Sequence, residues 1–172
     1  MQISAEAIKA LREQTSAGIM ECKHALQETG GDLTAAASSI LKERGYAIAK
    51  KKENRVASEG LVECYIHTGG RIGALVEVNC ESDFVARTPE FKELAHDLAM
   101  QVVGACPRYV SPEDVAEGEE FADEDCLLLQ PFIKDPDKKV QDIVTETIAK
   151  VRENIKVRRF VRFALRSDGQ DE

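Results

Sequence analysis

The side chains that most often do covalent or metal chemistry are few in this sequence and lie far apart. The three histidines, His24, His67 and His96, do not form the HxxxH spacing of a metal-binding helix. No GxSxG motif is present, and no cysteine stands beside a histidine in a pattern typical of a thiol nucleophile. We therefore expect a protein that is not an enzyme, holds no metal and needs no cofactor.

The cysteines favour a reducing compartment. There are five of them, an odd number, and no two form a CxxC pair. Such a set is typical of reduced cytosolic thiols rather than of a disulfide framework or a zinc site. Cys22 and Cys80 fall on apolar stripes, where a small buried thiol is the ordinary interpretation.

A polar corner at residues 79–91, "NCESDFVARTPEF", carries an aromatic side chain that needs an explanation. Phe84 follows Asp83 directly, between the end of an expected strand and a helix that the Thr-Pro pair should begin. The pattern alone favours a structural interpretation, in which Ser82 caps a turn and Phe84 folds back into the core. The alternative is an exposed aromatic that anchors a protein interface.

The basic segment 156–166, "KVRRFVRFALR", is the strongest candidate for a nucleic-acid contact. Aromatic and basic side chains are interleaved along it, namely Lys156, Arg158, Arg159, Phe160, Arg162, Phe163 and Arg166. Bases can stack on aromatic rings along a cationic groove. However, the segment also alternates like a strand, which would place Phe163 on the apolar face, and sheets use basic residues to block edge pairing. We favour the strand and expect no direct nucleic-acid contact.

Length and composition limit the protein to one core-bearing domain with a small additional module. The chain has 172 residues, of which 43% are apolar and 31% charged, as in a globular protein. A formal net charge of −8 argues against a nucleic-acid binder that uses its whole surface. We see no signal peptide and no apolar run approaching the ~20 residues that cross a bilayer. We expect a cytoplasmic protein without membrane attachment.

Hydrophobic periodicity divides the chain into four parts. Residues 1–45 predict three short helices in a small module, with Gly45 placed to end the third helix. Residues 46–57 predict a linker with partial helical character. Residues 58–166 predict a hairpin, two helices and a final strand, and residues 167–172 a frayed tail. The order β-β-α-α-β predicts a small antiparallel sheet packed with helices, so the fold class is α+β.

Five blocks of the sequence resemble, in order and spacing, the translation elongation factor Ts family. "LREQTSAGIMECKHAL" (11–26) resembles the family's signature LRxxTGAGxMxCKxAL, and "RIGALVEVNCESDFVAR" (71–87) resembles its core signature with the TDFV tetrapeptide. The other three blocks are "AKKKENRVASEGLVE" (49–63), "QPFIKD" (130–135) and "ENIKVRRFVRF" (153–163). The likeness that these blocks mark extends over nearly the whole chain.

The resemblance implies a partner and a mode of contact. The family exchanges GDP on elongation factor Tu, the GTPase that delivers aminoacyl-tRNA. An N-terminal module similar to a ubiquitin-associated domain binds the partner's G domain. The residues at the matching positions are Leu11, Ile19 and Met20. Met20 is the better candidate, because methionine suits adaptable surfaces and Ile19 also fits the module's own stripe.

The resemblance also gives the corner a function. The segment that dislocates the partner's Mg²⁺ would be Ser82, Asp83, Phe84 and Val85. An inserted aromatic can shift the loop that holds the phosphates, and a carboxylate can disturb the water shell of the metal. We expect Asp83 and Phe84 to account for most of the effect and Val85 to pack beneath them. With the resemblance, an exposed Phe84 becomes the favoured interpretation.

Three departures from the family pattern bear on these expectations. Ser82 replaces the usual threonine, and Ser16 replaces a common glycine. The chain has one core unit where long members repeat it, and short members tend to pair. We therefore expect a homodimer, with its interface on the exposed sheet or on the apolar connector 127–133.

Other functions stay open from the residues alone. One is an RNA- or ribosome-associated protein that uses Lys50–Lys52 and segment 156–166. A second is a small-molecule enzyme with a cysteine nucleophile. A third is a binder of ubiquitin-like domains through residues 1–45.

Overall fold

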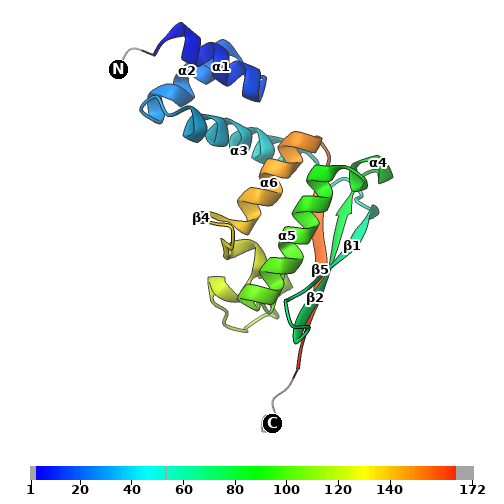
Figure 1. Ribbon diagram of the computed structural model, residues 1–172. Helices are drawn as coiled ribbons and strands as arrows, with labels where there is room; N and C mark the ends of the chain where they lie inside the picture. The colour runs from blue at the N-terminus through cyan, green and yellow to red at the C-terminus, as the bar shows by residue number, and fades with distance from the viewer. Residues whose placement is uncertain (1–2, 53, 166–172) are drawn as a thin grey trace.

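The N-terminal part of the chain is a three-helix module with a core of its own (Figure 1). The computed structural model describes residues 3–52 and 54–165. The helices are α1 (Ala5–Thr15), α2 (Ile19–Glu28) and α3 (Leu33–Lys52). The tail predicted for residues 167–172 lies outside the described residues.

Side-chain caps begin the outer helices of the module. Ser4 Oγ accepts a hydrogen bond from the Ala7 amide at 3.2 Å, and Asp32 Oδ1 accepts one from the Thr34 amide at 2.8 Å. The module's buried side chains are Leu11, Ala17, Cys22, Ala25, Leu26, Ala36 and Ile40. Most are small, so this core alone is modest for the size of the module.

The third helix is longer than the sequence predicts. Gly45 does not end it, and the helix continues to Lys52 through much of the expected linker. At Gly45 it meets α6 (Val140–Val151) so closely that an added Cβ would lie 2.2 Å from the carbonyl oxygen of Thr145. The glycine permits close packing here instead of providing a C-cap. One continuous helix therefore joins the module to the rest of the protein.

An antiparallel three-stranded sheet in the order β1-β2-β5 forms the second part (Figure 1). The strands are β1 (Glu59–Ile66), β2 (Ile72–Cys80) and β5 (Ile155–Ala164). Two helices, α5 (Pro89–Ala105) and α6, cover one face of it. This layout confirms the predicted α+β class.

The main core lies between the central strand and the two helices. Alternate residues of β2 are buried on the helix side, from Ala74 through Val76 and Val78 to Cys80. Phe91 and Leu98 of α5 pack against them and are almost fully buried. Fully burying a side chain of this size stabilises the fold by about 1.5–3 kcal/mol. The C-terminal end of β2 is therefore packed firmly against the core.

The final strand contains an irregularity that reverses its two faces. Glu77 pairs with Arg159, whereas its neighbour Val78 pairs with Val157, so Arg158 is an extra residue. Beyond this bulge, Phe160 packs against the core, while Phe163 lies on the uncovered face with 78% of its surface exposed. The prediction that Phe163 lies on the apolar, core-facing side is wrong.

The chain between the two long helices forms short turns and a small hairpin. The elements are η1 (Pro112–Asp114), η2 (Asp123–Asp125), η3 (Leu127–Leu129), β3 (Pro131–Phe132) and β4 (Asp135–Lys139). Gln101 of α5 anchors this segment, because its Nε2 donates to Gln130 Oε1 and to the Pro131 carbonyl, both at 3.1 Å. Leu127 and Phe132 are buried, so the predicted connector is largely part of the core.

Candidate functional site

The corner at the end of β2 presents Phe84 to solvent. Helix α4 (Asp83–Ala86) is a single turn, and its N-cap Ser82 accepts a hydrogen bond from the Val85 amide at 3.4 Å. Phe84 is 77% exposed, whereas Val85 on the same turn is 5% exposed. The interpretation in which Phe84 folds into the core is therefore excluded. Val85 packs into the core beneath it, as predicted.

Asp83 lies on the same exposed turn and is paired locally. Its Oδ2 accepts a hydrogen bond from Arg87 Nη2 at 2.8 Å, and both side chains are mostly exposed. Exposed pairs four residues apart on a helix contribute little, about 0.3–0.5 kcal/mol. The carboxylate can therefore leave Arg87 for another cation at small cost.

Two glutamates, Glu81 and Glu153, connect this corner to the turn between α6 and β5. Glu153 accepts hydrogen bonds from the Ser82 amide at 3.0 Å and from Ser82 Oγ at 2.7 Å. In the opposite direction, Glu81 accepts one from the Asn154 amide at 2.8 Å. Sequence reasoning missed both glutamates. Their partners lie 71 and 73 positions away in the chain, and no periodicity links residues so far apart. The only signal was that both lie in blocks resembling the family.

The end of α3 reaches the same corner. Glu81 is 3.3 Å from Lys52 Nζ and 3.2 Å from Arg55 Nη1. The Asn154 amide, with help from Arg55 and Lys52, keeps the pKa of Glu81 below its usual value despite partial burial. Burial, with the nearby Glu153 carboxylate, raises the pKa of the Cys80 thiol to about 11. Cys80 is therefore a neutral, inert packing group at physiological pH.

The first turn of α2 exposes two of the three candidate contact residues in the module. Ile19 is 56% exposed and Met20 is 73% exposed. Leu11, in contrast, is completely buried among the module's own core residues. It can support a contact surface from below but does not form one, so a direct contact through Leu11 is not compatible with this packing.

A charged pair holds that exposed turn in place. Glu21 accepts from the Gly18 amide at 3.2 Å and forms two hydrogen bonds with Arg44 of α3, at 2.9 and 2.8 Å. Arg44 is the main cause of the lowered pKa of Glu21. Ser16, where the family commonly has glycine, adopts the left-handed conformation with φ 54°. The turn thus keeps a glycine-type backbone that is mildly unfavourable for serine.

The uncovered face of the sheet is mostly apolar, with the ion pair of Glu77 and Arg159 beside Val62. Its exposed side chains, which we call the open sheet face, are Val62, Cys64, Ile66, Leu75, Val161 and Phe163. The strand register places Leu75 directly between Cys64 and Val161, so these side chains are contiguous across all three strands. A contiguous exposed apolar surface is typical of a protein interface.

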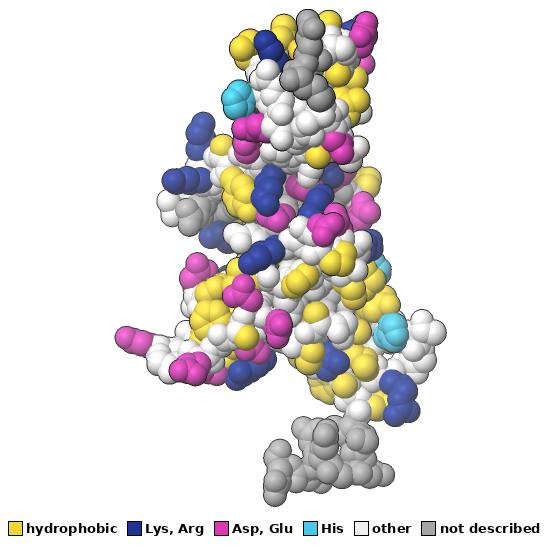
Figure 2. Space-filling view, turned by 90° about the vertical axis from the view of Figure 1, so that its left-hand side faces the viewer, with side chains coloured by type: hydrophobic (Ala, Val, Ile, Leu, Met, Phe, Trp, Pro, Cys, Tyr) yellow, Lys and Arg dark blue, Asp and Glu magenta, His cyan; other side chains and the backbone are white. Residues whose placement is uncertain are grey.

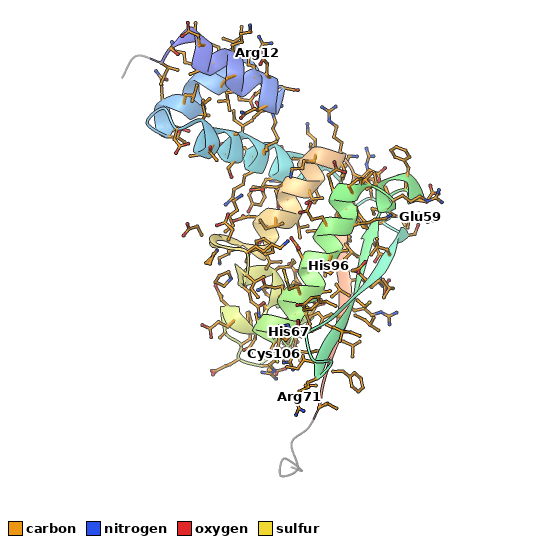
Figure 3. The ribbon with its side chains drawn as sticks, viewed as in Figure 1. Arg12, Glu59, His67, Arg71, His96 and Cys106 are labelled. Carbon is orange, nitrogen blue, oxygen red and sulfur yellow. The ribbon has the colours of Figure 1, made fainter. Side chains whose placement is uncertain are left out.

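Two of the histidines, both labelled in Figure 3, lie beside Tyr65, whose ring centroid is 6.1 Å from that of His67 and 5.6 Å from that of His96. His96 Nδ1 is 3.7 Å from Glu63, and His67 Nδ1 is 3.2 Å from the Tyr65 hydroxyl. Within residues 3–52 and 54–165, no three His, Cys, Asp or Glu side chains are placed to hold a metal ion. No helix in these same ranges has the length and apolar character needed to cross a membrane.

A polar groove marks the junction of α3 with α6. Figure 2 shows this side of the molecule, where basic and acidic side chains are mixed. Two of the acids in the groove are paired with lysines: Asp142 is 3.0 Å from Lys42, and Glu146 is 2.9 Å from Lys138. Tyr46 donates to Asp142 at 2.8 Å, and burial together with this carboxylate raises the pKa of Tyr46 to about 12. The contacts of Asp142 join α3 to α6, and the contact of Glu146 joins α6 to β4.

The fold and these surfaces define an α+β protein whose candidate sites are protein contacts: a helical module, a projecting aromatic corner and an apolar sheet face. Residues 1–119 match the family described as Elongation factor TS. Elongation factor Ts of Thermoanaerobacter sp. is 49% identical over an alignment of 192 positions that covers 94% of each chain. That of Carboxydothermus hydrogenoformans is 50% identical over an alignment of 194 positions, covering 95% of this chain and 89% of the relative.

The chain belongs to the elongation factor Ts family. Its members are non-catalytic nucleotide exchange factors for elongation factor Tu in translation, a process of the bacterial cytoplasm. The predicted family, function and absence of catalytic activity are thereby confirmed.

Proposed function

We propose that this protein binds elongation factor Tu·GDP at two places and releases GDP by disturbing the Mg²⁺ and phosphate site. In this proposal residues 1–45 are the partner-binding module and residues 58–166 are the core that presents the corner. The segment between them, helical as far as Lys52, joins the two contacts. The observation that carries the proposal is the exposed Phe84 on a firmly held one-turn helix.

The first contact is made by Ile19 and Met20, with Leu11 supporting them from inside the module. Both exposed side chains lie on the first turn of α2, which Glu21 and Arg44 fix in position. An aliphatic and a flexible thioether side chain suit a groove between helices of a partner. This contact supplies affinity and orientation and does not touch the nucleotide.

The second contact is the segment from Ser82 to Val85, which disturbs the partner's nucleotide site. Phe84 enters the partner and displaces the elements that hold the phosphates. The Asp83 carboxylate leaves its ion pair with Arg87 and approaches the partner's Mg²⁺, where it competes with the water ligands of the metal. Ser82 and Val85 hold these two side chains from the cap and from the core. No bond is made or broken by this chain.

The energetic requirement is a coupling between two ligands. Exchange factor and GDP must weaken each other's binding to the partner by the same factor. A factor that bound both states of the partner equally would not release GDP, however tight the complex.

The test is release of a fluorescent GDP analogue from elongation factor Tu with wild type and with Asp83→Ala/Phe84→Ala. We expect rapid release with wild type and a loss of at least about tenfold with the double variant. The circular dichroism spectrum and melting temperature should stay close to wild type, because both side chains are exposed. Equal acceleration by the two proteins would move the mechanism elsewhere on the surface.

Two further surfaces are candidates for the interface of a homodimer, the open sheet face and the connector 127–133. The open sheet face is apolar, contiguous and not covered by any described element. The alternative interface, the connector 127–133, is largely buried, and Ile133 at 47% is its main exposed apolar side chain. We therefore propose the open sheet face as the surface through which two copies pair.

A further inference from the structure

We propose that Glu153 is a positioning residue for nucleotide exchange, because its carboxylate fixes Ser82 and thereby makes the Phe84 corner a preformed projection. This inference rests on the proposed function, in which the corner acts on the partner's nucleotide site. Glu153 itself lies behind the corner, in the turn between α6 and β5, and would not touch the partner's metal.

The contact between Glu153 and Ser82 is bidentate. One carboxylate oxygen accepts from the Ser82 amide at 3.0 Å and the other from Ser82 Oγ at 2.7 Å. The Ser82 carbonyl is also occupied, since it accepts from Cys80 Sγ at 3.1 Å and from the Ala86 amide at 3.3 Å. All three polar groups of the N-cap are therefore held. Hydrogen bonds to an ionised carboxylate are about twice as strong as neutral ones.

The turn that carries Glu153 is itself fixed to the corner from the other side. Asn154 is 4% exposed, and its amide donates to Glu81 at 2.8 Å while its Nδ2 donates to the Arg55 carbonyl at 3.2 Å. Arg152 ends α6 in the left-handed conformation, with φ 57°, and its carbonyl accepts from Lys52 Nζ. Each glutamate thus holds the backbone beside the other. A single displacement of the corner would break the contacts of both Glu81 and Glu153.

A fixed corner matters because Phe84 has to displace elements of the partner when it binds. A projection that is disordered before contact must be ordered at the expense of the free energy that would displace the nucleotide. Loosening Ser82 should therefore leave the contact through α2 intact but reduce the displacement at the nucleotide site. The maximal rate of GDP release should fall, whereas the factor concentration at half-maximal rate should change little.

The variant that tests this is Glu153→Gln, which keeps the size of the side chain. Its NH₂ group cannot accept the Ser82 hydroxyl proton, so the hydroxyl has to turn and accept from the NH₂ group while it also accepts from the Val85 amide. Both contacts with Ser82 also lose the carboxylate charge that strengthens them. GDP release is measured over a range of factor concentrations. We expect the maximal rate to fall at least about tenfold and the half-saturating concentration to change less than about twofold. Glu117→Gln, the same change in the exposed acidic segment 113–125, is the matched control and should behave as wild type.

A second variant removes the Ser82 hydroxyl, which donates to Glu153 and also caps α4. Ser82→Ala keeps the amide hydrogen bond to Glu153 and should show an intermediate loss of maximal rate. The double variant should lose less than the two single losses combined, since both changes weaken the same contact between Glu153 and Ser82. Fully additive losses would overturn the proposal.

The remaining outcomes separate this inference from the proposed function. If Phe84→Ala loses exchange but Glu153→Gln keeps the wild-type maximal rate, Glu153 has no positioning role and the proposed function stands. If Glu153→Gln raises the half-saturating concentration as strongly as it lowers the rate, and melts early, its role is only structural. If neither wild type nor any variant accelerates release, the proposed function itself fails.

Discussion

Phe84 and Val85 are adjacent residues on one helical turn with opposite environments, 77% and 5% exposed. The sequence pattern alone favoured a buried Phe84 and was wrong, because both residues are apolar and a helix of only four residues shows no periodicity. The resemblance to a known family provided the choice, and the physical reason is visible only in the folded protein. Ser82 and its capping contacts set the rotation of the turn.

Substitutions of Phe84 and Val85 should have different effects, the first on nucleotide exchange and the second on stability. Phe84→Ala should leave the free energy of unfolding within about 0.5 kcal/mol of wild type and abolish most exchange activity. Val85→Ala should cost about 1–3 kcal/mol, because it leaves a cavity in the core. Thermal unfolding and GDP release measured on both variants would check this, and a destabilised Phe84→Ala would contradict the exposed position.

The pair between Asp83 and Arg87 gives a second prediction. Arg87→Gln should change the free energy of unfolding by less than about 0.5 kcal/mol, because both side chains are exposed. It should not reduce exchange, since it frees the carboxylate that we expect to act. Asp83→Asn, which keeps the shape, should lower the exchange rate. A loss of exchange in Arg87→Gln together with normal exchange in Asp83→Asn would reverse the assigned roles.

At the scale of elements, the junction between α3 and α6 depends on Gly45. Gly45→Ala places a methyl group 2.2 Å from a backbone oxygen that cannot move aside, so we expect a loss of about 1–3 kcal/mol. Gly104→Ala in α5 is the control, because there the added group meets only the flexible end of Ile133. Chemical denaturation compares the two. Equal stability of both variants would contradict the close approach.

The same junction should weaken in acid. Burial opposes ionisation of Asp142, but hydrogen bonds from Lys42, Tyr46 and the Lys139 amide outweigh it and lower its pKa. A lowered pKa in the folded state stabilises the fold above the unfolded value of about 3.9, and this contribution is lost as the pH falls further. The melting temperature of wild type should therefore drop more steeply below about pH 4 than that of Asp142→Asn. Parallel curves would contradict this coupling.

Two features of the elements could not be predicted from periodicity. Gly45 has the same appearance in a sequence whether it ends a helix or lets two helices approach, and only the position of α6 decides between them. The strand of Phe163 was predicted correctly, but one extra residue at Arg158 reverses which side chains face the core. Alternation predicts a strand well and predicts its faces only when no bulge intervenes.

At the scale of the whole molecule, pairing of two chains should depend on the open sheet face. Leu75→Lys puts a charge at its centre, and we expect this variant to sediment as one chain of 19.0 kDa while wild type sediments as two. Phe121→Lys makes a comparable change at an exposed aromatic residue in the acidic segment and should leave pairing intact. A wild type that is monomeric at working concentration would contradict the dimer.

The unbroken third helix has a further consequence for the whole molecule. Its 20 residues form a rod of about 30 Å, packed against α6 at Gly45 and held at its last residue by Glu81. In the proposed complex, the two contact regions would therefore reach elongation factor Tu at a fixed distance from each other, like the arms of a chelating ligand. Once the module has bound, the corner is present at an effective concentration set by this rod rather than by diffusion. Avidity of this kind lets each contact be weak and quickly reversible, which a factor that must leave after every exchange requires.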